Sequence, residues 1–142
     1  MFKGEYRHNL DSKNRIIIPA KLRSELGATF VVSKGLDGCL SIYTNQEWEK
    51  RINQILTLPS TKREVRMYIR SVAAKAIDVE CDSMGRIQLS NALKKDAKLD
   101  KSCVIIGAGD HVEIWASDAW DQYYSDASEV LEDVLEGLTE FM

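Results

Sequence analysis

The sequence predicts an α+β fold in which one unit occurs twice and both copies form a single pseudo-symmetric body. The motif Asp-Ser-x-x-Arg at residues 11–15 returns at residues 82–86, and a short β-like run and a helical segment follow it both times. Apolar and aromatic positions further along also match, across one extra residue in the second copy. The matched pairs are Leu22 with Leu93, Val32 with Val104, Gly35 with Gly107, Leu40 with Val112, Ile42 with Ile114, Tyr43 with Trp115 and Trp48 with Trp120. Two copies are too few for a solenoid, so we expect one body built from both.

The first repeat with its helix is expected over residues 1–58. Residues 1–10 predict a weak strand, and residues 11–14 predict a tight turn with positive φ at Asn14. Asp11 can accept backbone hydrogen bonds two residues on, and Asn is the side chain that best tolerates that conformation. Residues 16–18 form the next strand, so Arg15 is aimed from a rigid element.

A helix, a hairpin and a second helix complete this repeat. Pro19 opens the first, short helix and Gly27 ends it. The alternation in residues 30–33 and 39–43 predicts a hairpin. Thr44 or Asn45 then caps a helix with one apolar face. That face holds Trp48, Ile52, Ile55 and Leu56.

The rest of the chain is divided into a connecting helix (residues 59–75), a second repeat (76–122) and an acidic amphipathic C-terminal helix (123–142). The second repeat has Gly85 at the turn position of Asn14, a short helix near 91–98 and a hairpin of 103–106 with 112–115. Ser117 or Asp118 is expected to cap its last helix. The apolar side of the tail holds Val130, Leu131, Val134, Leu135 and Leu138. The connecting helix carries a stripe of Arg63, Arg66 and Arg70, which either faces solvent or meets the acidic half of a neighbouring subunit.

Charge is divided between the two halves of the chain. The formal net charge is −3, but residues 1–75 hold 14 Lys and Arg against 7 Asp and Glu, and residues 76–142 hold 5 against 15. A basic half can meet a polyanion such as nucleic acid, and an acidic half can meet its own neighbours. The distribution therefore favours a nucleic-acid partner, which the acidic total alone would argue against.

Composition points to a reducing compartment and away from the membrane. No stretch holds the roughly 20 apolar residues of a membrane helix, and the N-terminus lacks the apolar segment of a secretory signal. The three cysteines, Cys39, Cys81 and Cys103, are odd in number and form no C-x-x-C pair. We expect them to be small core residues of a cytoplasmic protein, with no metal and no cofactor.

The N-terminal motifs resemble a known family. The pattern Phe2-x-Gly4, His8-x-Leu10-Asp11-x-Lys13-x-Arg15 and Ile18-Pro19-x-Lys21-x-Arg23 is similar to the opening of the bacterial MraZ proteins. The tandem Asp-x-x-x-Arg motif extends the resemblance over essentially the whole chain. Each copy also resembles the swapped-hairpin domain of the AbrB/SpoVT transition-state regulators.

The resemblance implies both a fold and a function. The implied fold is a pseudo-two-fold double-split β-barrel made from two AbrB-like βαββ repeats with flanking α-helices. The implied function is transcriptional regulation in the nucleoid, by binding tandem short repeats upstream of the division and cell-wall gene cluster. The implied assembly is a homo-oligomeric ring on double-stranded DNA.

Arg15 is the main predicted DNA contact, because a guanidinium can grip a phosphate or bond guanine O6 and N7. The other predicted DNA-binding residues are Lys13, Lys3, Arg7, His8, Lys21 and Arg23. The alternative is that Arg15 pairs only with Asp11 and closes the turn. Met84 replaces Lys13 in the second copy, so Asp82, Gly85 and Arg86 are expected to serve mainly the fold or the subunit contact.

Two other classes of function compete with DNA binding. Two Asp-Ser elements in a duplicated β protein could form an aspartic-protease pair, but those enzymes need Gly directly after Asp-Ser, where Lys13 and Met84 stand. A lysine there would also depress the raised pKa that such a pair requires. We therefore expect no catalytic residues and no small-molecule substrate. The second alternative is an antitoxin-like interaction module that acts through the acidic C-terminal helix.

Overall fold

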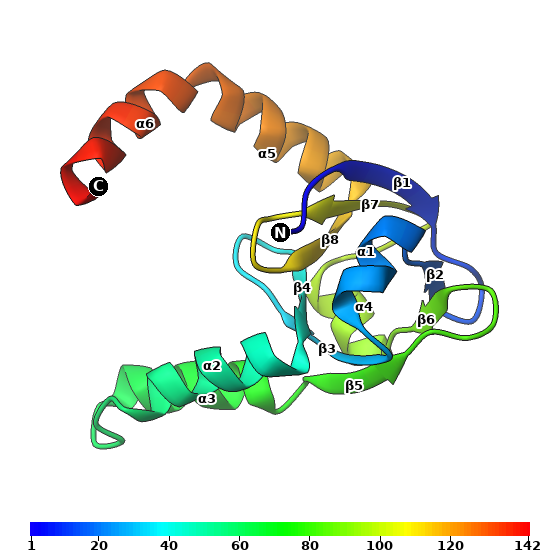
Figure 1. Ribbon diagram of the computed structural model, residues 1–142, viewed down its shortest axis with the longest axis horizontal. Helices are drawn as coiled ribbons and strands as arrows, with labels where there is room; N and C mark the ends of the chain where they lie inside the picture. Colours follow the sequence, from blue (N-terminus) through cyan, green and yellow to red (C-terminus); the bar gives the residue numbers. More distant parts are fainter.

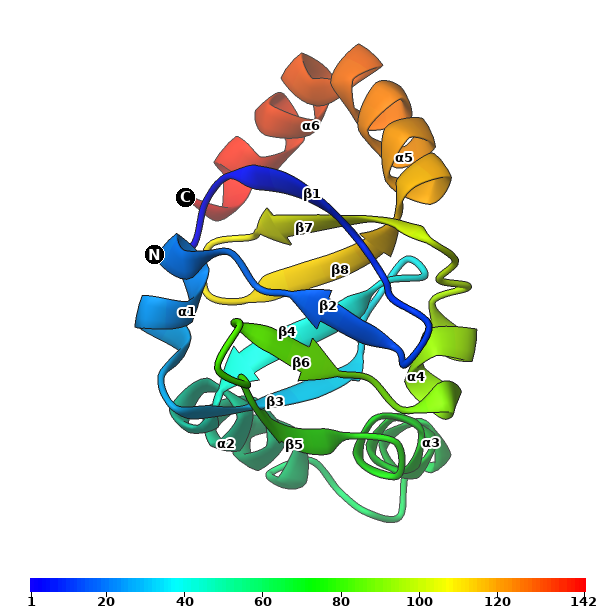
Figure 2. The same cartoon turned by 90° about the vertical axis from the view of Figure 1, so that its right-hand side faces the viewer.

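A computed structural model of residues 1–142 has a mixed α+β fold, as predicted (Figure 1). Six strands form one antiparallel sheet in the order β1-β7-β8-β4-β3-β5, and β2 and β6 form a separate two-stranded ribbon across the core (Figure 2). The strands are β1 Glu5–Asn9, β2 Arg15–Ile17, β3 Thr29–Lys34, β4 Leu40–Thr44, β5 Ile77–Glu80, β6 Arg86–Gln88, β7 Ser102–Gly107 and β8 Val112–Ala116.

The chain also forms six α-helices and a final 3₁₀ turn. They are α1 Ala20–Leu26, α2 Asn45–Leu56, α3 Arg63–Ala73, α4 Asn91–Asp96, α5 Ser117–Glu129, α6 Leu131–Leu138 and the 3₁₀ turn Thr139–Phe141. The short helices α1 and α4 lie beside the ribbon, whereas α2–α3 and α5–α6 extend as two arms from the other side (Figure 1). Each repeat therefore has the order strand, strand, helix, strand, strand, one strand more than the expected βαββ unit.

The two repeats exchange their first strands. β1 of the first repeat pairs with β7 of the second, and β5 of the second pairs with β3 of the first. The repeats meet again at β4–β8 and at β2–β6. A single cluster of 20 buried residues fills the space between sheet and ribbon, with contributions from both copies. Because strands and core are shared, neither repeat is complete without the other.

Strand register corrects the repeat alignment by one residue in β3 and β7. Asn9 lies opposite Ser102, and its counterpart Glu80 lies opposite Thr29, so Ser102 matches Thr29. The expected matches of Val32 with Val104 and of Gly35 with Gly107 are therefore wrong, because Val32 corresponds to Ile105. A continuous apolar run has no polar alternation to mark its register, so the sequence fits either alignment.

Helix ends follow the predicted signals in the first repeat and differ in the second. Thr44 caps α2 by accepting a hydrogen bond from the Glu47 N–H (3.1 Å). Neither Ser117 nor Asp118 caps α5, because that helix begins at Ser117 directly after β8. The tail is two helices, which meet at Val130 with φ −116° and ψ 8°, and α5 runs across the expected boundary at residue 122.

Cys39 and Cys103 are buried, as expected, and Cys81 is half-buried. Burial raises the pKa of the Cys39 thiol to about 12 and that of Cys103 to about 11. All three are free thiols. None of the helices has the length and apolar character that spanning a bilayer requires.

Candidate nucleic-acid interface

The first Asp-Ser-x-x-Arg motif forms the predicted turn. The Asp11 carboxylate accepts hydrogen bonds from the backbone N–H groups of Lys13 (2.9 Å) and Arg15 (2.8 Å). It also accepts one from Nε of Arg15 at 2.7 Å. Asn14 has φ 59°, which confirms the expected positive φ at the fourth position. One carboxylate thus closes the turn and orients the arginine that follows it.

The second motif repeats this geometry. The Asp82 carboxylate accepts from the backbone N–H groups of Met84 and Arg86 (both 2.9 Å) and from Nε of Arg86 (2.8 Å). Gly85 takes the positive φ, at 78°. The backbone hydrogen bond from the arginine is the largest cause that holds the pKa of Asp11, and likewise that of Asp82, below its ordinary value. Two acids with lowered pKa are the opposite of the proton-sharing pair that an aspartic protease needs.

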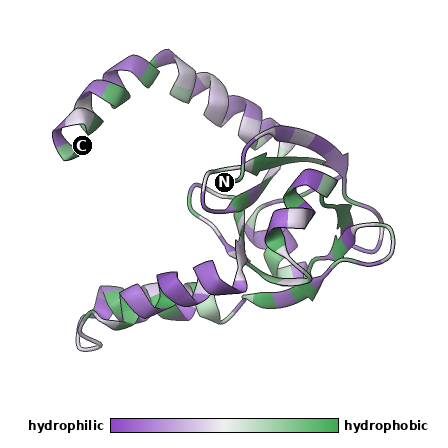
Figure 3. Cartoon of the chain, viewed as in Figure 1, coloured by the Kyte–Doolittle hydropathy of each residue, from purple (hydrophilic) through white to green (hydrophobic).

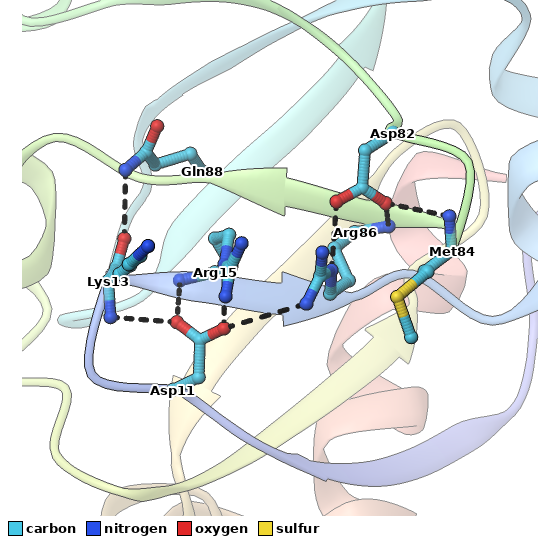
Figure 4. Close-up of polar contacts among 7 residues, drawn as sticks. All are labelled: Asp11, Lys13, Arg15, Asp82, Met84, Arg86 and Gln88. Carbon is cyan, nitrogen blue, oxygen red and sulfur yellow. Dashed lines mark hydrogen bonds and ion pairs between the residues drawn. The ribbon is translucent and has the colours of Figure 1, made fainter.

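The two arginines lie on one face of the β2–β6 ribbon (Figure 4). Ile16 pairs with Ile87 at the centre, and both side chains are buried in the core. Alternation along the strands turns the four flanking side chains outward. These are Arg15, Ile17, Arg86 and Gln88. The Arg15 side chain is 31% exposed and that of Arg86 is 23% exposed, and both line one hollow of about 250 Å³.

Each turn is fastened to the other repeat. The Ile18 N–H donates to the Gly85 carbonyl (2.9 Å), and the Leu89 N–H donates to the Asn14 carbonyl (2.8 Å). The Arg23 guanidinium lies directly against Gly85, in space that a Cβ would fill. Each of these contacts crosses between copies, so both turns are held by residues of the other repeat.

Comparison with known proteins identifies the family of this chain. The sequence model of the family described as "MraZ protein, putative antitoxin-like" matches twice, over residues 1–71 and 72–141. A curated relative from Ligilactobacillus salivarius (strain UCC118), named "Transcriptional regulator MraZ", is 41% identical over 141 residues, which cover 99% of each chain. The chain belongs to the MraZ family. The resemblance stated from the N-terminal motifs is thereby confirmed, and the two family matches coincide with the duplication.

Some of the other predicted DNA-binding residues of this MraZ-family chain lie near the ribbon and some do not. Lys13 is exposed on the first turn, and Arg23 reaches the second turn. Lys3 and Lys21 line a different hollow, of about 540 Å³, between the N-terminal segment and α1. The structure therefore places Lys13 and Arg23 at opposite ends of the ribbon that carries Arg15, and it gathers Lys3 and Lys21 separately.

Arg7 and His8 point to opposite sides of β1. Arg7 donates to the Asp121 carboxylate of α5 at 2.7 Å, and a second acid, Glu5, lies 3.5 Å away. His8 is half-buried on the core side of the strand. Alternation along β1 turns the two side chains to opposite faces of that strand. Because β1 belongs to the six-stranded sheet, neither side chain lies on the outer face of the ribbon.

Sequence reasoning missed Gln88 and Ile17, the other two outward residues of the ribbon. Gln88 donates from Nε2 to the Lys13 carbonyl at 2.9 Å, and Ile17 is 38% exposed. The sequence does carry one signal for them, because side chains alternate between the two faces of a strand on both sides of Ile16 and Ile87. That alternation shows that residues 17 and 88 share a face only once β2 and β6 are known to pair.

A second polar cluster lies under the two arms, away from the ribbon. His111 contacts the carboxylates of Asp110 and Glu113, both at 2.8 Å, and Arg51 of α2 donates to Asp110 at 2.7 Å. Glu113 also accepts from Nε1 of Trp115 (3.0 Å). The hydrogen bond with Glu113 is the main cause that raises the pKa of His111. No group of three or more His, Cys, Asp or Glu side chains is arranged to hold a metal ion.

Proposed function

We propose that this MraZ-family chain is a sequence-specific DNA-binding transcriptional regulator and not an enzyme. The observation that carries the proposal is the outer face of the β2–β6 ribbon, where Arg15 and Arg86 are each held by an aspartate of their own turn. The printed name of the 41% identical relative supports the same function.

The dimensions and chemistry of the ribbon suit the major groove of DNA. That groove admits a two-stranded β-ribbon, and a guanidinium there can donate two hydrogen bonds to guanine O6 and N7. In both arginines the aspartate of the same turn binds Nε, which leaves the two terminal nitrogens of Arg15 for a base. Nη1 of Arg86 also lies 4.0 Å from the Asp11 carboxylate, an ion pair too long for a hydrogen bond, so the terminal nitrogens of Arg86 can still donate to a base. Lys13 and Arg23, beside the ribbon, suit phosphates. Arg7, which is tied to Asp121, is not part of the proposed contact.

We further propose that the subunits assemble head to tail. Helix α6 exposes a row of apolar side chains among acids, and the α2–α3 arm exposes apolar side chains among arginines (Figure 3). The exposed apolar residues of α6 and its flanks are Val130, Leu131, Val134, Leu135, Leu138 and Phe141, and those of the other arm are Leu56, Leu58, Met67 and Tyr68. Two different complementary surfaces make a heterologous contact, which closes into a ring if the rotation allows.

A ring would explain why tandem repeats suit this chain. Each subunit offers few cationic contacts, so a single site binds weakly, whereas joined subunits on adjacent sites can gain about 10²–10⁴ in avidity. The expected sites are short repeats upstream of the division and cell-wall gene cluster, in the nucleoid of the cytoplasm. At the level of the fold, we propose that sheet and ribbon together form a double-split barrel, since β1 lies against β2 and β5 against β6.

The decisive experiment is a mobility shift with the protein's own upstream region at two salt concentrations. Arg15→Ala and Arg86→Ala should each weaken binding by about 1–3 kcal/mol per engaged site, and Lys13→Ala should lower the salt slope by about 1. The matched control is Lys50→Ala, an exposed cation of α2 that makes no ion pair. If Arg15→Ala and Arg86→Ala both bind like wild type, the ribbon is not the DNA contact.

The second candidate is an interaction module that acts through α6, favoured by the exposed apolar face of that helix. Removing residues 128–142 separates the two candidates. A DNA-binding protein keeps its contact with a single repeat and loses only the gain from several repeats, whereas an interaction module loses its partner and has no DNA affinity to keep.

A further inference from the structure

We infer that Gln88 and Ile17 make the ribbon a directional reader, with Gln88 accepting a hydrogen bond from a base amino group and Ile17 contacting a thymine methyl at the opposite end. The inference rests on the proposed DNA-binding function and adds which bases are read and in which orientation.

The pseudo-two-fold axis of the ribbon is broken at these two positions. In the register of β2 with β6, Arg15 lies opposite Gln88 and Ile17 lies opposite Arg86. A rotation about the centre exchanges the two arginines with each other, but it exchanges Ile17 with Gln88. A two-fold symmetric reader favours a palindromic site, as in DNA-binding dimers. An amide at one corner and an aliphatic group at the other remove that equivalence.

The ribbon is large enough for its corners to meet different base pairs. Two outward side chains on one strand are about 6.8 Å apart, twice the rise per residue. This spacing equals about two base-pair steps of roughly 3.4 Å, so the outer face covers about three base pairs. The Arg15–Gln88 corner pair and the Ile17–Arg86 corner pair thus lie over opposite ends of one short element.

The contact between Gln88 and Lys13 determines which part of the amide is available. Nε2 of Gln88 donates to the Lys13 carbonyl, so the amide orientation is set and Oε1 is left as an acceptor that points away from the turn (Figure 4). In the major groove, adenine N6 and cytosine N4 are the amino groups that can donate to it. Ile17 has no polar atom in its side chain, and an apolar contact with the thymine methyl is the readout left to it.

In vitro selection from a random DNA pool tests this inference with three full-length proteins that differ in the ribbon: wild type, Gln88→Ile and Ile17→Gln. Wild type should enrich a non-palindromic element with adenine or cytosine at one end. Gln88→Ile should reduce that enrichment about tenfold, the weight of one good base contact, without changing the positions read by the arginines. Ile17→Gln should add the same preference at the other end and produce a palindrome. Both residues are exposed, and equal thermal melting of the three proteins is the control for folding.

A second measurement separates base reading from support of the turn. In the selected element, the base opposite Gln88 is replaced by an analogue without the amino group. Wild type should lose affinity for this DNA, and Gln88→Ile should not. If Gln88→Ile instead weakens all sequences equally, Gln88 only holds Lys13 in place and the inference is wrong. If all three proteins select the same sequence while Arg15→Ala loses binding, the inference fails and the proposed function stands. If wild type enriches no sequence, both fail.

Discussion

At the scale of the residue, the aspartates of the two turns do more than the sequence reveals. The sequence predicts that Asp11 closes a turn and orients Arg15, and the structure adds that one oxygen binds two backbone N–H groups while the other binds the guanidinium. From the sequence, pairing with Asp11 is the alternative to a DNA contact, but the two are compatible. The pair uses Nε and leaves the outer edge of the guanidinium free.

The carboxylate of Asp82 should make stability depend on acid pH. Its folded-state pKa lies below the ordinary value of 3.8, chiefly because of the Arg86 backbone hydrogen bond. The stabilisation is therefore complete above pH 3.8 and is lost as the pH falls through the lower folded-state pKa. Urea unfolding should show Asp82→Asn less stable than wild type near pH 6, with a difference that shrinks below pH 3.8. Asp133→Asn on the exposed helix α6 serves as control, and a difference that does not change with pH would contradict this role.

Ser33 is a buried hydroxyl without a hydrogen-bond partner. Its counterpart in the second repeat, by the register of β3 and β7, is the apolar Ile106. Because the unpaired hydroxyl is costly to bury, Ser33→Ala should leave the free energy of unfolding unchanged or raise it by up to about 1 kcal/mol. Thr44→Ala is the contrasting change, since it removes the α2 cap and should cost about 1 kcal/mol. Urea unfolding measures both, and a clear loss in Ser33→Ala would show that the hydroxyl has a partner.

At the scale of the element, the β2–β6 ribbon makes the two motifs equivalent candidates for DNA contact, although the sequence predicts different roles for them. The sequence favoured the first copy for DNA, since Met84 stands in place of Lys13. Pairing of β2 with β6 makes Arg86 as good a candidate as Arg15, because both lie on the same outer face. Lys13 and Met84 lie in the turns, so the difference between them changes the chemistry at the ends of this face and not at its centre.

The His111 cluster joins the β7–β8 turn to α2, and it should respond to alkaline pH. The hydrogen bond with Glu113, and then that with Asp110, raise the pKa of His111 above 6.5, whereas burial and, to a smaller extent, Arg51 oppose this rise. The protonated ring stabilises the fold fully below pH 6.5, and this contribution is lost as the pH rises through the raised pKa. Both acids have lowered pKa values and stay charged in this window, and the Cys39 thiol titrates only near 12.

His111→Gln tests this cluster by urea unfolding at pH 6 and pH 9. The variant should be less stable than wild type at pH 6, and the difference should shrink by pH 9. The other histidine supplies the control, because His8→Gln leaves the cluster intact. A difference that grows toward alkaline pH would mean that the neutral ring is the stabilising form.

At the scale of the whole molecule, the two arms are the parts that the monomer leaves without partners. Every residue of α6 is exposed, and the arginines of α3 divide between two roles. Arg66 donates to the carbonyls of Ser60 and Thr61 (both 2.9 Å) within its own arm. Arg63 and Arg70 are exposed on α3. Two of the three stripe arginines, Arg63 and Arg70, are therefore available to contact a neighbouring subunit.

Reversing charge on one arm should dissociate the assembly, and reversing both should restore it. Arg63→Glu with Arg70→Glu places acids opposite the acidic α6 of the next subunit, so sedimentation should show smaller species that bind a single repeat normally. Glu132→Lys with Glu136→Lys should do the same. All four changes in one chain should recover the oligomer, because the charges are again complementary. Full-size oligomers in each two-residue variant would exclude docking of these arms.

By itself the sequence determined the two turns with positive φ and the short helix that starts after Pro19, because each depends on residues within a few positions of one another. It also determined the duplication and the family, because a match between two stretches of sequence is visible whatever their fold. Only the tertiary structure decided the strand exchange, the register of β3 and β7, the pairing of Arg7 with Asp121 and the face shared by Arg15 and Gln88. Those features join residues 45 or more positions apart, the shortest separation being that of Val32 and Ile77 in β3 and β5. Local conformational preference carries no information over that distance, and burial of one common core selects the pairing.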